Sequence, residues 1–257
     1  MHTLHVFTDI VYDPDHERCR YDVFRPHGDE RVPLVLLIHG GGWTGGHRVR
    51  YHESCLRLAS EGYAAVTIGY RLSPQVRWPE IAYGVLRAAA HIKAHADEWA
   101  IDADRAVTWG SSAGGHLALV LQAWASKWVT KGISGHVPEI VGTVAQCPVV
   151  KAPDPANPGL GAQTFGPEDR LEETSPYHIA GERFRSVLIV HGDKDATIPI
   201  EHSRELVARL SGENVDATLV ELPGAPHGFG YDLANAHAPA CMERALSYVK
   251  SRLGSRD

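Results

Sequence analysis

Three polar residues that lie far apart in the chain have the side chains needed for nucleophilic catalysis: Ser112, Asp195 and His227. A serine hydroxyl is a poor nucleophile at neutral pH. It needs a base to remove its proton and a carboxylate to orient and stabilise the charged imidazole. The residues occur in the order Ser, Asp, His, and each follows a stretch that the sequence predicts as a strand. We therefore expect them to form a catalytic triad.

The serine lies in the motif Gly110-Ser111-Ser112-Ala113-Gly114, which matches the pattern Gly-x-Ser-x-Gly. In a nucleophile elbow the two glycines leave room for a strained serine between a strand and a helix. The turn also points backbone N–H groups toward the place where an oxyanion forms, so Ala113 is a candidate oxyanion-hole donor. An isolated motif of this kind is more often a plain loop, so its meaning depends on the rest of the chain.

A second glycine-rich motif, His39-Gly40-Gly41-Gly42-Trp43, directly follows the apolar stretch 34–38. Glycines at this place allow the backbone to approach a ligand and leave N–H groups free to donate. A flexible turn without a catalytic role is the alternative. Because this pattern is the expected partner of a nucleophile elbow, Gly41 and Gly42 are the other candidate donors of an oxyanion hole.

Two aspartates compete for the role of the acid, because Asp193 and Asp195 occur in one loop. We favour Asp195 and expect Asp193 to hydrogen-bond within its own turn, as aspartates commonly do. Two other histidines, His39 and His191, each end an apolar stretch before a glycine, and we interpret both as structural. We expect His116 to lie on the helix that follows the elbow.

Aromatic residues near these motifs are candidates for a substrate pocket, although packing in the core is the usual role of any one aromatic side chain. The candidates are Trp43, Trp78, Phe165, Phe229 and Tyr231.

The elements that position these residues alternate regularly along the chain. The sequence predicts a hairpin of strands at 4–7 and 20–24, further strands at 34–38, 64–68, 106–109, 141–145, 186–190 and 217–222, and helices at 50–60, 80–96, 115–126, 201–210 and 236–253. Such an alternation is typical of an α/β fold. We expect a single domain over residues 1–257, with a mostly parallel sheet of about eight strands and helices on both faces.

The stretch 151–185 interrupts this pattern, because five prolines break it and it contains no long amphipathic helix. We expect a short cap-like insertion over the pocket. Its acidic residues should form a polar rim around a pocket of limited depth, which would favour short acyl chains. These residues are Asp154, Glu168, Asp169, Glu172 and Glu173.

Composition excludes several classes of function. The chain has 257 residues, a formal net charge of -6 and no run of Lys or Arg, so a nucleic-acid partner is not expected. The N-terminus has no signal-peptide pattern and no stretch is apolar enough for a membrane span, so we expect a cytoplasmic protein that acts on small molecules. The four cysteines, Cys19, Cys55, Cys147 and Cys241, are widely spaced, which favours buried thiols over a metal site or disulfides.

Five motifs in order resemble those of the α/β-hydrolase esterases. They are HGGGW at 39–43, YRLSP at 70–74, GSSAGG at 110–115, HGDKDATIP at 191–199 and HGF at 227–229. Within this superfamily the chain is similar to the hormone-sensitive-lipase-like carboxylesterases and to the smaller bacterial feruloyl and acetyl esterases. The resemblance implies an α/β-hydrolase fold that needs no metal or cofactor. It also implies that Ser112 is the nucleophile, Asp195 the acid and His227 the base. The implied oxyanion donors are Gly41, Gly42 and Ala113.

Two departures from the family pattern favour the smaller esterases. Ser111 stands where the family often has Asp, and the sequence contains no counterpart of the large N-terminal helical cap. The leading hypothesis is a serine carboxylesterase that cleaves short-chain or aryl esters through an acyl-enzyme. An amidase or arylformamidase with the same triad is the alternative, and a non-catalytic ligand-binding protein on this scaffold is a third. The sequence makes no prediction of the oligomeric state or of the natural substrate.

Overall fold

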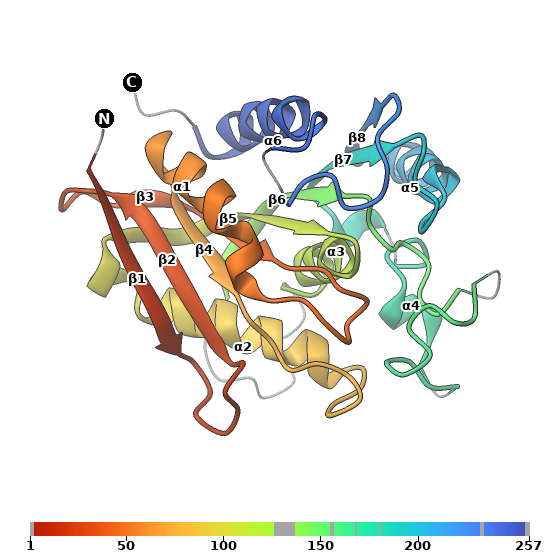
Figure 1. Cartoon of the computed structure of the whole chain (residues 1–257), viewed down its shortest axis with the longest axis horizontal. Coiled ribbons are helices and arrows are strands. Elements are labelled where there is room, and N and C mark those ends of the chain that lie inside the picture. The colour runs from red at the N-terminus through yellow and green to blue at the C-terminus, as the bar shows by residue number, and fades with distance from the viewer. Residues whose placement is uncertain are drawn as a thin grey trace.

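A twisted sheet forms the centre of the computed structural model, which describes residues 3–125, 137–154, 157–167, 169–179, 181–231 and 234–254 (Figure 1). Its strands are β1 (Leu4–Val11), β2 (Arg20–Pro26), β3 (Val32–Ile38), β4 (Ala64–Ile68), β5 (Ile101–Ser111), β6 (Glu139–Gln146), β7 (Ser186–Gly192) and β8 (Asp216–Leu222). Within the described ranges the sheet has eight strands in the order β1-β2-β4-β3-β5-β6-β7-β8. The β1–β2 and β2–β4 pairs are antiparallel and all other pairs are parallel, which confirms the predicted sheet.

Helices cover both faces of this sheet. They are α1 (His52–Ser60), α2 (Glu80–Ala94), α3 (Ala113–Ala125), α4 (Leu171–Thr174), α5 (Ile200–Gly212) and α6 (Ala238–Leu253), with 3₁₀ turns η1 (Arg48–Tyr51), η2 (Ala96–Trp99) and η4 (Gly181–Arg183). Buried residues of α2, α3 and α5 belong to one apolar cluster, and those of α1 and α6 to the other. Figure 1 shows α1 and α6 on the opposite side of the sheet from α2 and α3.

The strand β3 shows why the sheet needs both layers. Leu34 and Leu36 pack into the cluster with α2 and α3, whereas Val35 and Leu37 pack into the cluster with α1 and α6. All four side chains are fully buried. A strand that is apolar at every position is stable only where both of its faces are covered. The apolar strands thus place the site loops at a rigid edge.

The polar segment before the predicted strand 106–109 belongs to the strand, which was not expected. β5 begins at Ile101, and its register with β3 shifts between Pro33 and Leu34. Asp104 and Arg105 are exposed there. An irregular register turns side chains away from the covered faces, so the strand accommodates two charged residues that the sequence alone assigned to a gap.

The helix ends differ from the predictions in a similar way. The first turn of the helix predicted at 50–60 is the 3₁₀ turn η1, and the last turn of that predicted at 80–96 gives way to η2. Such turns are common at helix ends. The last residue of the helix predicted at 115–126 lies outside the described residues. Within the described ranges, no helix combines the length and the apolar composition needed to span a bilayer.

The insertion at 151–185 contains only the short elements α4 and η4 among its described residues. Glu172 and Glu173 are exposed, as a polar rim requires. Asp154 is not on the rim: it is buried and its carboxylate lies 3.6 Å from Nε2 of His202. A buried carboxylate needs polar partners, and no sequence pattern indicates this one. Glu168 lies outside the described residues.

Candidate active site

The candidate catalytic residues lie at one edge of the sheet. Ser112 directly follows β5, Asp195 lies in the loop after β7, and His227 lies in the loop after β8. These three strands run parallel. The carboxyl ends of parallel strands meet at one edge, so residues from distant parts of the chain become neighbours.

Two hydrogen bonds connect the three side chains. Nε2 of His227 lies 3.0 Å from Oγ of Ser112, and Nδ1 of His227 lies 2.7 Å from Oδ2 of Asp195. When Nδ1–H donates to the carboxylate, Nε2 carries the lone pair that accepts the serine proton. The structure therefore brings together the three residues that the sequence selected.

Ser112 has the strained backbone of a nucleophile elbow. Its φ is +56°, in the left-handed region that few side chains tolerate. A Cβ atom at Gly110 would lie 2.1 Å from the carbonyl oxygen of Gly114, and one at Gly114 would lie 2.1 Å from that of Ile38. Only glycine fits these two positions, so the motif's glycines allow the tight turn.

Asp195 has a fully buried side chain with four hydrogen-bond partners. Its Oδ1 accepts from the backbone N–H groups of Thr197 and Ile198, each at 2.8 Å. Its Oδ2 accepts from His227 and also from Nε2 of His191, at 3.1 Å. Burial opposes the charge, but hydrogen bonds from both imidazoles and Ile198 outweigh it and hold the pKa of Asp195 well below its usual range.

The competing aspartate points elsewhere. Asp193 is exposed, and its Oδ1 accepts from the backbone N–H of Gly224 at 2.7 Å. The sequence predicted that this carboxylate would close its own turn, but the bond instead ties the loop after β7 to the loop after β8. The geometry thus supports Asp195 as the acid and gives Asp193 a role between loops.

Two residues next to the triad were missed as functional residues. His191 is buried, contacts Asp195 through Nε2, and accepts at Nδ1 from Oγ of Ser203 at 2.7 Å. Its spacing of four residues from Asp195 was the available signal. Cys147 is also buried, and its Sγ lies 3.6 Å from Oγ of Ser111.

The Cys147 thiol also affects the imidazole. Burial lowers the pKa of His227, but interactions with Asp195 and Cys147 outweigh burial and raise it above its ordinary value of 6.5. Ligand atoms of Cys147, Asp195 and His227 lie within 4.8 Å of one another, the spacing of a potential metal site among the described residues. Both ring nitrogens of His227 are engaged by Asp195 and Ser112, which favours the triad over metal binding.

The candidate oxyanion donors lie in the glycine loop after β3 and at the start of α3. Gly41 and Gly42 have φ values of +121° and +61°, and Ala113 is the first residue of α3. In the part of the chain that the structure describes, none of their N–H groups donates to a protein acceptor. Free N–H groups beside a nucleophile are what an oxyanion hole requires.

The candidate pocket aromatics Trp43, Trp78, Phe165 and Phe229 are buried, and Tyr231 is partly buried. Trp43, Trp78 and Phe165 form one cluster, with ring centroids 5.0 Å apart for Trp43–Phe165 and 5.5 Å for Trp78–Phe165. Phe165 also lines a cavity of about 350 Å³ in the insertion. Phe229 packs on the other face of the sheet, in the cluster with α6. Their contact with substrate stays a prediction.

The other singled-out histidines are neutral and structural in this fold. Burial lowers the pKa of His39 to about 3 and that of His116 to about 4. The ring of His39 stacks on Tyr70, and Nε2 of His116 donates to the carbonyl of Thr174 at 2.6 Å. The latter bond connects α3 to the insertion.

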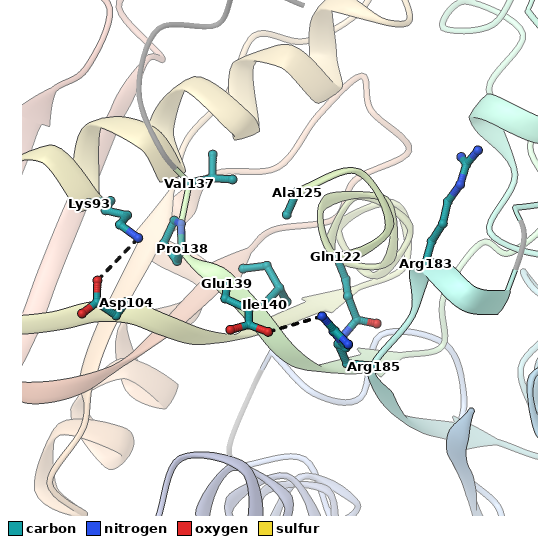
Figure 2. A pocket seen from close by; sticks show the side chains of 10 residues that line it. All are labelled: Lys93, Asp104, Gln122, Ala125, Val137, Pro138, Glu139, Ile140, Arg183 and Arg185. Atoms are coloured by element: carbon teal, nitrogen blue, oxygen red, sulfur yellow. Dashed lines mark ion pairs between the residues drawn. The ribbon is translucent and has the colours of Figure 1, made fainter. Parts of the chain in front are cut away.

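A pocket of about 510 Å³ lies at the opposite edge of the sheet from the triad (Figure 2). Asp104, Glu139 and Arg185 line it near the amino ends of β5, β6 and β7. Four of its charged groups form pairs, at 3.5 Å for Lys93–Asp104 and 3.6 Å for Arg185–Glu139. Because the pocket lies at this opposite edge, its lining residues do not contact Ser112.

The sequence matches the family model BD-FAE over residues 21–210. Among curated proteins, it is 27% identical to esterase LipC of Mycobacterium tuberculosis, over 77% of this chain and 53% of LipC. It is 28% identical to the probable carboxylic ester hydrolase LipM of the same organism, over 96% of this chain and 63% of LipM. The chain thus spans between about half and two thirds of the length of these relatives.

Solved structures agree with the fold. Esterase B from Lactobacillus rhamnosis superposes with a TM-score of 0.84 at 20% identity, over 96% of this chain and 85% of that one. Because the family model spans most of the chain and the fold agrees, the chain belongs to the BD-FAE family, within the α/β-hydrolase esterases that its motifs resemble.

Proposed function

We propose that this chain is a serine carboxylesterase that cleaves small carboxylic esters through an acyl-enzyme. The observation that carries the proposal is the unbroken line of hydrogen bonds from Ser112 through His227 to Asp195. The names of its relatives, an esterase and a probable carboxylic ester hydrolase, support ester hydrolysis for this chain too.

The first half of the reaction forms the acyl-enzyme. Oγ of Ser112 attacks the ester carbonyl carbon while its proton passes to Nε2 of His227. Asp195 stabilises the resulting imidazolium through Nδ1. His227 then gives the proton to the alkoxide oxygen, the C–O bond breaks, and the alcohol leaves.

The second half releases the acid. His227 accepts a proton from water, the hydroxide attacks the acyl carbon, and the serine leaves with the proton from His227. In both halves the carbonyl oxygen becomes an oxyanion. The free N–H groups of Gly41, Gly42 and Ala113 are suited to stabilise it, and each such donor is worth about 10²–10³ in turnover.

The nucleophile is tested by comparing two adjacent serines. We expect a fluorophosphonate probe to label the wild type and Ser111→Ala, because Oγ of Ser112 hydrogen-bonds to His227, whereas Oγ of Ser111 is buried 3.6 Å from Sγ of Cys147. Ser112→Ala should not be labelled and should lose ester hydrolysis while keeping its fold, since the hydroxyl acts through chemistry rather than packing. Labelling of Ser112→Ala would place the nucleophile elsewhere.

The bond that is cleaved is tested with the same enzyme. We expect hydrolysis of p-nitrophenyl acetate and methyl ferulate to exceed that of N-formylkynurenine, an amide. The reverse order would make the chain an arylformamidase with the same triad.

A further inference from the structure

Tyr231 lies four residues after His227, and its hydroxyl stands where three catalytic segments meet. The hydroxyl oxygen accepts from the backbone N–H of Gly40 at 2.5 Å and donates to the backbone carbonyl of Ser111 at 3.3 Å. Gly40 begins the candidate oxyanion loop, and Ser111 immediately precedes the nucleophile. One side chain therefore joins the loops that carry the base, the oxyanion donors and Ser112.

The surroundings of Tyr231 hold its ring in place. Its ring packs against that of Tyr51, with centroids 5.2 Å apart, and the guanidinium of Arg50 lies 5.5 Å from the ring centroid. Burial raises the pKa of Tyr231 to about 12. The hydroxyl thus keeps its proton at neutral pH and can accept and donate at once.

The three segments pack closely against one another at Gly40. A Cβ atom at Gly40 would lie 2.4 Å from the carbonyl oxygen of Ser111, 2.5 Å from the hydroxyl of Tyr231 and 3.2 Å from Cβ of Ser112. Backbone packed this closely moves only as a unit. The position of the oxyanion loop relative to Ser112 is therefore set at this point.

We propose that Tyr231 is a positioning residue that fixes the oxyanion loop against the nucleophile elbow. Its hydroxyl accepts the hydrogen bond of the Gly40 N–H. The next two N–H groups, of Gly41 and Gly42, are left free for the oxyanion. This role rests on the proposed esterase function. Tyr231 was a pocket candidate in the sequence, and its hydroxyl instead faces backbone atoms.

Tyr231→Phe isolates the hydroxyl because it keeps the ring and its packing. The N–H of buried Gly40 then loses its acceptor, and the loop loses its link to Ser111. Oxyanion donors act mainly on the transition state, so kcat should fall by at least about 10-fold while KM changes little. A lost pocket contact would instead raise KM.

Tyr248→Phe is the matched control. The Tyr248 hydroxyl donates to Oγ of Ser186 at 2.9 Å, at the amino end of β7, far from the site. Tyr248→Phe also removes a partly buried hydroxyl that hydrogen-bonds within the fold, but its kcat should stay at the wild-type value. If Tyr231→Phe matches Tyr248→Phe in kcat at a temperature where both are folded, the positioning role is overturned.

Amide hydrogen exchange gives a readout that does not depend on activity. In Tyr231→Phe, exchange at Gly40 should accelerate by at least about 10-fold, since a buried N–H without a partner is costly and opens readily. It should be unchanged in Tyr248→Phe. Unchanged exchange in Tyr231→Phe would overturn the inference, whether or not the wild type hydrolyses esters. If the wild type hydrolyses no ester but Gly40 exchanges faster in Tyr231→Phe, the proposed function is refuted and the link between the loops is kept.

Discussion

At the scale of single residues, the carboxylate of Asp195 is shared by two imidazoles. His227 and His191 both donate to Oδ2, while Oδ1 accepts from two backbone N–H groups. A carboxylate held by four donors keeps one orientation and one charge state. In the proposed reaction, Asp195 is therefore aligned with His227 before the proton moves.

The two aspartates of this loop should differ sharply when each is changed to asparagine. Asp195→Asn should lower kcat by about 10⁴, because an amide favours the wrong tautomer of the imidazole. Asp193→Asn should have a small effect, since an amide oxygen still accepts from Gly224. Kinetics on a p-nitrophenyl ester measure both. The opposite ranking would assign the acid to Asp193.

The pH dependence should follow the raised pKa of His227. A raised pKa means that the imidazolium is stabilised relative to the neutral ring. Because only the neutral ring accepts a proton from Ser112, kcat/KM should rise with pH through a midpoint above 6.5. Cys147→Ala removes one interaction that raises the pKa, so its midpoint should move to lower pH. Cys55→Ala, in the distant helix α1, is the control. A profile flat from about pH 5 to 9 would contradict a histidine base.

At the scale of elements, strands were predictable where their faces are uniform. β4 has the bounds predicted from its apolar run, because both of its faces are covered. The start of β5 was missed because its exposed Asp104 and Arg105 break the pattern. Ser112, Asp195 and His227 could be selected as candidates because each follows a recognisable strand.

The contacts of Tyr231 and His191 could not be predicted from the sequence. They depend on which loops meet across the sheet edge. Local sequence does not encode that the hydroxyl of Tyr231 reaches Gly40 on another loop. The same holds for the buried partner of Asp154. Side chains that connect elements become visible only once strand order and register are known.

Two adjacent glycines of the oxyanion loop should respond differently to alanine. A Cβ atom at Gly41 would lie 2.4 Å from the carbonyl oxygen of Gly45, and its φ is +121°. A Cβ atom at Gly42 meets nothing closer than 3.8 Å, and its φ of +61° is one that non-glycine residues adopt at a modest cost. Gly41→Ala should lose kcat by about 10²–10³ or more, the value of an oxyanion donor. Gly42→Ala should keep most of the wild-type kcat. Equal losses of kcat in the two variants would contradict this account of the loop.

At the scale of the whole molecule, the candidate triad lies apart from the insertion and from the antiparallel end of the sheet. The antiparallel β1–β2 end lies at one side of the sheet, and the triad lies after β5, β7 and β8. The insertion is connected to the oxyanion loop through the Trp43–Phe165 contact. We therefore expect the size of the acyl chain to be limited by the insertion, a segment that holds none of the candidate triad residues.

This separation predicts a preference for short acyl chains. The described part of the insertion has no helix longer than α4, and Glu172 and Glu173 are exposed on it. Each buried methylene contributes about 0.8 kcal/mol only where a pocket has room for it. kcat/KM should be highest for acetyl to butyryl p-nitrophenyl esters and should fall by octanoyl. A preference for decanoyl esters, or a jump in rate on emulsified substrate, would contradict it.

The long-range contacts of the site also determine when it forms during synthesis. The Ser112–His227 bond joins residues 115 apart in sequence, and the Gly40–Tyr231 bond joins residues 191 apart. A nascent chain that has left the ribosome only as far as β8 contains the nucleophile and the acid but no base and no link to the oxyanion loop. Because contacts of such long range form late, the candidate site is complete only after the segment through Tyr231 has folded. Under the proposed function, ester hydrolysis would report that this late step has been reached, and chains that end before His227 should be inactive.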